Sequence, residues 1–103
     1  MEATGPWLTR HTAQAPAALR ERVLRHVYAV PPGDSVAETL ADASRQALRQ
    51  VELDPTAGRP VALDLLAADA LITLALLAQA QEQPSGLRDF ATGLLQHPVG
   101  PHD

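Results

Sequence analysis

Residues 61–80, VALDLLAADALITLALLAQA, constrain this chain more than any other stretch, because they form one long apolar segment with helical spacing. On a helical wheel the large side chains do not form a stripe but occupy most of the circumference. These side chains are Leu63, Leu65, Leu66, Leu71, Ile72, Leu74, Leu76 and Leu77. A helix that is apolar all round lies at the centre of a core or crosses a membrane. The fold must therefore cover this helix on nearly every side.

Length alone permits a membrane span, since about 20 apolar residues cross a bilayer. Asp64 and Asp69 oppose it, because each carboxylate costs roughly 2.5–3.5 kcal/mol near the bilayer centre. No aromatic belt flanks the segment, and the other helical segments are amphipathic and need a surface to pack on. We therefore expect a soluble protein with no membrane partner. The first eleven residues lack the basic and apolar regions of a signal peptide, so we expect the protein in the cytoplasm.

Proline and glycine divide the chain into segments whose apolar spacing is helical and never alternating. This pattern predicts an all-α protein. Helices are expected over about residues 16–30, 36–52, 60–83 and 85–96. The connections between them are short, so sequential helices should be antiparallel neighbours. The predicted fold is a small four-helix up-and-down bundle.

The ends of the chain are expected to lie outside this bundle. We predict a flexible N-terminal arm at 1–11, a single helical domain at 12–97 and a disordered tail at 98–103. The second helix carries a recognisable start, since SVAE at 35–38 fits a capping box with Ser35 as the N-cap and Glu38 reaching back to it.

Three amphipathic neighbours cover only about two-thirds of the long apolar helix, which leaves an apolar strip facing water unless a second copy covers it. Small side chains permit close helix approach, and four residues form such a ridge along the helix. The candidate dimer interface is therefore Ala67, Leu71, Ala75 and Ala78. The sequence predicts a homodimer.

The two acids of the long helix are predicted to differ. Asp64 lies close to the helix start, where the helix dipole tolerates negative charge, and is expected to be partly exposed. Asp69 has large apolar neighbours, including Leu65 and Ile72, and is predicted to be a buried structural acid. Its expected partners are an arginine of the first or second helix, the Trp7 indole N–H, or free backbone N–H groups where another helix begins. About 140° of helical rotation separates the two acids, so they cannot share one metal or one water.

Several function classes are excluded by what the chain lacks. Eight basic residues against twelve acidic ones give a net charge of −4 with no basic cluster, so no nucleic-acid partner is expected. There is no cysteine, and no two of the four histidines have the i, i+4 spacing of a helical metal site. His26 is expected to be a partly exposed cation near a helix end. We predict no catalytic residues, no metal and no cofactor.

The leading functional hypothesis is a self-associating protein-interaction module, with a partner protein as a second binding partner. The alternative is a helical-bundle ligand-binding protein or enzyme with an internal polar pocket around Asp69. Such a pocket would use an arginine such as Arg22, Arg45 or Arg49. A third hypothesis is a membrane-associated subunit.

Overall fold

The computed structural model describes residues 3–53 and 58–95, and within these ranges every regular element is helical. The prediction of an all-α protein is therefore confirmed. The elements are α1 (Thr4–His11), α2 (Ala17–Tyr28), α3 (Val36–Leu53), α4 (Arg59–Glu82), the short 3₁₀ turn η1 (Pro84–Gly86) and α5 (Leu87–Leu95). The bounds of α2 to α5 lie within two residues of those predicted. The predicted disordered tail at 98–103 lies outside the described residues.

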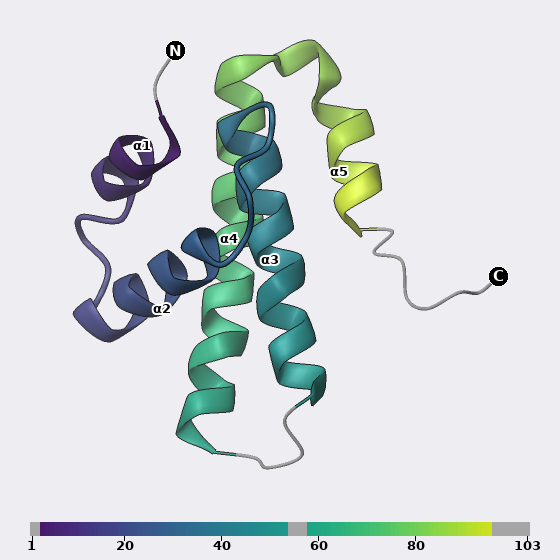
Figure 1. The fold of residues 1–103 in the computed structure, drawn as a ribbon. Helices are drawn as coiled ribbons and strands as arrows, with labels where there is room; N and C mark the ends of the chain where they lie inside the picture. The colour runs from purple at the N-terminus through teal and green to yellow at the C-terminus, as the bar shows by residue number, and fades with distance from the viewer. Residues whose placement is uncertain (1–2, 54–57, 96–103) are drawn as a thin grey trace, which may run out of the picture.

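The centre of the fold is the hairpin of α3 and α4, which lie side by side over most of their length (Figure 1). Both helices bury many small side chains. Ala37, Ala41, Ala43 and Ala47 of α3 are buried. The side of α4 that packs inward, here called its inner face, consists of Asp64, Ala67, Ala68, Leu71, Ala75 and Ala78. Small buried residues on both helices let the two backbones approach closely.

This packing shows that the predicted dimer interface is wrong. Ala67, Leu71, Ala75 and Ala78 are each 0% exposed within a single chain, so no second copy can reach them. The prediction placed the small-residue ridge on the surface of the single chain, outside its core. Instead the ridge is part of the core, because all four of its side chains are buried within the single chain.

The remaining helices do not extend the hairpin into an up-and-down bundle. Figure 1 shows α2 crossing the α3–α4 hairpin and α5 folding back from the end of α4. Five α-helices form within the described residues, where the sequence predicted four. The fifth is α1, which replaces most of the predicted flexible arm. Trp7 and Leu8 are buried, and the Trp7 Nε1–H donates to Gln81 Oε1 of α4 at 3.0 Å.

The α3 helix begins where the capping pattern predicts. Ser35 Oγ accepts a hydrogen bond from the Glu38 N–H at 3.1 Å, as expected for an N-cap. The Glu38 carboxylate reaches the Asp34 N–H rather than that of Ser35. A second cap comes from the far end of α4, since the Glu82 carboxylate accepts from the N–H groups of Val36 and Ala37, each at 3.3 Å. This contact fixes the register of the hairpin.

Candidate functional site

Asp64 lies at the centre of a polar cluster between α2 and α4. Its Oδ1 atom accepts a hydrogen bond from Arg22 Nη1 at 2.9 Å, and His26 Nε2 lies 2.8 Å from the same oxygen. A carboxylate can only accept, so Nε2 of His26 carries the proton of this contact. The three side chains are 13%, 19% and 4% exposed for Asp64, Arg22 and His26. The cluster is largely removed from water.

The local sequence of α2 explains how this cluster forms. Arg22 and His26 are four residues apart, so they project from the same face of the helix. Val23 and Val27, one position further along, are buried and hold that face against the hairpin. Asp64 is on the inner face of α4, and α2 crosses α4 at its level. The apolar packing of α2 thus places the Arg22 guanidinium and the His26 imidazole next to the Asp64 carboxylate.

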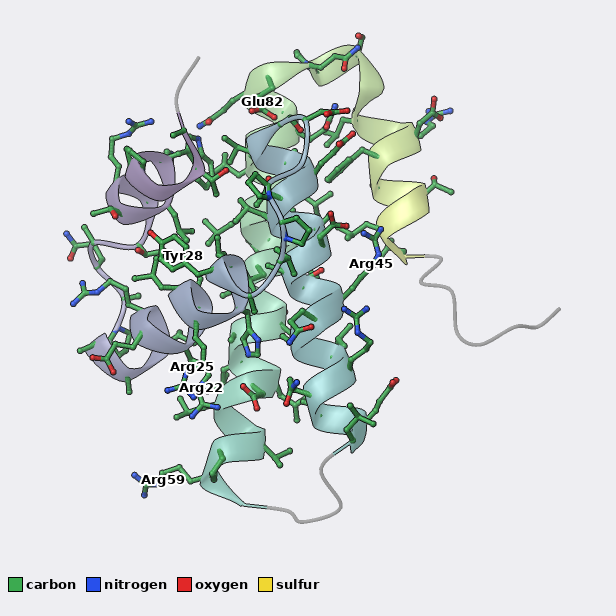
Figure 2. All side chains as sticks on the ribbon, viewed as in Figure 1. Arg22, Arg25, Tyr28, Arg45, Arg59 and Glu82 are labelled. Atoms are coloured by element: carbon green, nitrogen blue, oxygen red, sulfur yellow. The ribbon has the colours of Figure 1, made fainter. Side chains whose placement is uncertain are left out.

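An open pocket of about 250 Å³ adjoins this cluster. It is lined by Arg22, Arg25, His26 and Ala29 of α2, Gln46 and Gln50 of α3, and Asp64 of α4. Arg22 and Arg25 lie near one another beside α4, whereas Arg45 points away on the other side of α3 (Figure 2). Arg25 has no ion-pair partner among the described residues, so the pocket carries two fixed positive charges against one negative. Its chemistry suits a small anion with further hydrogen-bonding groups.

The cluster offers neither a metal site nor a nucleophile. Over residues 3–53 and 58–95, no group of three or more histidine, aspartate and glutamate side chains could hold a metal ion. The buried hydroxyl of Ser44 donates to the Ala41 carbonyl oxygen within its own helix. Arg22, His26 and Asp64 can hold a charge or move a proton.

The prediction of a buried Asp69 is wrong, because this side chain is exposed in the structure. Its large helical neighbours Leu65, Leu66, Ile72 and Leu76 had predicted a core position for Asp69. In fact Leu65 and Leu66 are themselves 49% and 55% exposed. The polar pocket that the alternative hypothesis placed around Asp69 forms around Asp64 instead. The predicted arginine partner of Asp69 is not found among the described residues, and Arg22 binds Asp64 instead.

The sequence reasoning also missed His26 and misplaced Asp64. His26 was expected near the surface, yet it is among the most buried polar side chains. A usable signal was present, since Arg22 and His26 share a face with the apolar stripe of their helix rather than with its charged side. A cation and an imidazole on a buried face call for an acid on a neighbouring helix.

The other notable surface is the side of α4 opposite its inner face, here called the outer face. It consists of Ala62, Leu65, Leu66, Asp69, Thr73, Leu76, Leu77 and Ala80. Leu65, Leu66 and Leu77 are 49%, 55% and 40% exposed, and no described element covers them. By length and composition α4 could also cross a membrane.

Comparison of the chain with protein-family models, with curated proteins and with solved structures gives no match.

Proposed function

We propose that this chain is a small self-associating protein-interaction module that acts in the cytoplasm and covers the outer face of α4 with another polypeptide. The observation that carries the proposal is the exposure of Leu65, Leu66 and Leu77 on one side of a single helix. Monomeric soluble proteins rarely leave a contiguous apolar patch larger than a few hundred Å² in water. A second copy is always present at equal concentration and is the first occupant to test.

The first test is the solution mass of the unmodified protein across the micromolar range, by light scattering. We expect a dimer that dissociates on dilution. Leu66→Glu should give a folded monomer, because a charge on the outer face opposes its burial and the side chain contributes little to the core. The matched control is Leu53→Glu, which adds the same charge at an exposed leucine of α3 and should leave the mass unchanged.

A monomer at every concentration would contradict self-association. The membrane hypothesis gives a different result, because it requires the chain to associate with lipid. Vesicles of neutral phosphatidylcholine provide this test. A protein that is monomeric in buffer and floats with these vesicles through α4 would replace the proposal with a membrane-associated subunit.

A second candidate function is the binding of a small anion in the pocket around Asp64. Its support is the convergence of Arg22 and Arg25 on a pocket of about 250 Å³, with Gln46 and Gln50 opposite. A pocket of this size fits one phosphate or carboxylate group and a few further atoms. Since Arg25 has no ion-pair partner among the described residues, its guanidinium donors remain to meet such a group.

Inorganic phosphate is the probe for this second function. At constant ionic strength it should raise the melting temperature of the unmodified protein, since a ligand that binds only the folded state stabilises it. Arg25→Gln should abolish the increase. Arg88→Gln, which removes the same charge from an exposed position on α5, should retain it. An equal increase in both variants would show a general ionic effect and end the anion proposal.

A further inference from the structure

The outer face of α4 forms one continuous strip along the helix. Along its midline the residues are separated by alternating steps of four and three, as on any single face of an α-helix. These residues are Ala62, Leu66, Asp69, Thr73, Leu76 and Ala80. Each of the six is exposed or half-buried in the single chain. The strip therefore follows the helix for 19 residues, the length over which a second helix can lie against it.

The same face is nearly palindromic about residue 71. Ala62 and Ala80 lie nine positions to either side of it, and Leu66 and Leu76 lie five positions to either side. The flanking leucines follow the rule as well, since Leu65 and Leu77 are six positions away. A two-fold axis that reverses the helix direction therefore brings alanine opposite alanine and leucine opposite leucine.

The central pair of the palindrome is not identical, but its two residues are chemically complementary. Asp69 and Thr73 lie two positions to either side of residue 71. In an antiparallel pair the carboxylate of one faces the hydroxyl of the other, and the hydroxyl donates a hydrogen bond to it. The two-fold axis makes this contact twice. The one acid on the outer face thus gains a partner that the single chain does not supply.

We propose that two copies pair antiparallel through α4, with their two-fold axis at the level of residue 71. This arrangement rests on the self-association proposed above and specifies its geometry. Leu66 packs against Leu76 of the partner subunit, and Asp69 accepts a hydrogen bond from Thr73 of the partner subunit. The contact runs from Ala62 to Ala80, which is about 27 Å of helix at 1.5 Å per residue.

The parallel alternative is disfavoured by the same residues. In-register parallel pairing sets Asp69 directly against Asp69 of the partner subunit, and like charges at the midline of a helix pair are destabilising. Antiparallel pairing displaces the two carboxylates by about 6 Å along the helix axis. It also gives each of them a hydroxyl donor.

Disulfide trapping tests the register without background, because the chain has no cysteine. Leu66→Cys and Leu76→Cys are prepared with tags of different size and are oxidised separately and as a mixture. We expect a disulfide-linked heterodimer in the mixture, because antiparallel pairing sets these positions at the same height. We expect no linked Leu66→Cys homodimer, since its two sulfurs would lie about 15 Å apart along the axis, beyond the reach of a disulfide.

A linked homodimer of Leu66→Cys alone would show parallel pairing and overturn the inference. If none of the three oxidations gives a linked product while light scattering reports a dimer, the dimer uses another surface. The register is then wrong and self-association stands. If light scattering reports a monomer, both proposals fail.

A charge exchange tests the central contact independently. Thr73→Asp sets an acid against Asp69 of the partner subunit and should raise the dimer dissociation constant about tenfold or more. The double variant Asp69→Thr with Thr73→Asp restores the acid–hydroxyl pair and should return the constant to its original value. A single variant that dimerises like the parent would overturn the proposed contact.

Discussion

The buried pair of Asp64 offers the most decisive measurement of stability, because the chain contains a matched exposed pair. Arg22 Nη1 lies 2.9 Å from Asp64 Oδ1, and Arg45 Nη1 lies 3.0 Å from Asp42 Oδ1. The distances and atoms are equivalent, but the Asp42 side chain is 50% exposed whereas that of Asp64 is 13% exposed. Only Asp64 also holds a buried histidine. Replacing each acid with alanine therefore compares an exposed ion pair with a buried one that also holds a histidine.

The expected cost of Asp64→Ala follows from the groups that it leaves behind. His26 is buried and loses its acceptor, which costs roughly 1–3 kcal/mol. Arg22 keeps a charge with limited access to water, and removing one partner of a buried ion pair costs roughly 3–5 kcal/mol. Water reaches part of the guanidinium, so we expect a total loss of about 3 kcal/mol. For a domain of this size that lowers the melting temperature by roughly 15 °C.

Urea unfolding followed by circular dichroism, at one fixed protein concentration, measures this loss as a shift of the midpoint at constant slope. Asp42→Ala should lose about 0.5 kcal/mol or less, as exposed pairs do. Asp64→Asn keeps a neutral acceptor and should fall between the two. Equal losses of unfolding free energy for Asp64→Ala and Asp42→Ala would refute the inference that burial increases the contribution of the cluster to stability.

Three further outcomes are expected. Glu82→Gln weakens the cap on the first N–H groups of α3 and should cost about 1 kcal/mol in the same urea assay, whereas a midpoint equal to that of the parent would show that water caps α3 as well. Trp7→Phe removes the hydrogen bond to Gln81 and should lower the stability by about 1 kcal/mol, and the single tryptophan of the parent should emit at short wavelength until α1 undocks. Ala75→Leu overpacks the α3–α4 contact and should cost about 1–3 kcal/mol, and a neutral result would mean that the hairpin is less closely packed than described.

The sequence by itself determined the helices and most of their limits. Proline and glycine mark the breaks, and Ser35 satisfies a backbone N–H at the start of α3 through atoms a few residues away. Val36, Leu40, Ala43 and Ala47, which recur at the spacing of one helix face, are buried. The helix limits and these buried positions depend on neighbours within one or two turns, so they can be predicted from the local sequence.

The orientation of α4 could only be decided by the tertiary structure. Hydrophobicity gave no answer, since the helix is apolar on every side. Which side turns inward depends on how α4 fits the helices around it, and in the structure the side with Ala67, Ala68, Ala75 and Ala78 is the buried one. That one rotation buries Asp64 and exposes Asp69, because about 140° of helix separates them.

The same distinction explains α1 and the polar cluster. Residues 4–11 have too few apolar side chains to predict a docked helix. Even so, Trp7 donates a hydrogen bond to Gln81 of α4, which lies 74 positions later in the chain. Arg22 and His26 are paired by local spacing, but the acid that they share is 42 and 38 positions away. Contacts over such separations arise when whole helices pack, so local patterns predict the elements and packing decides which side chains meet.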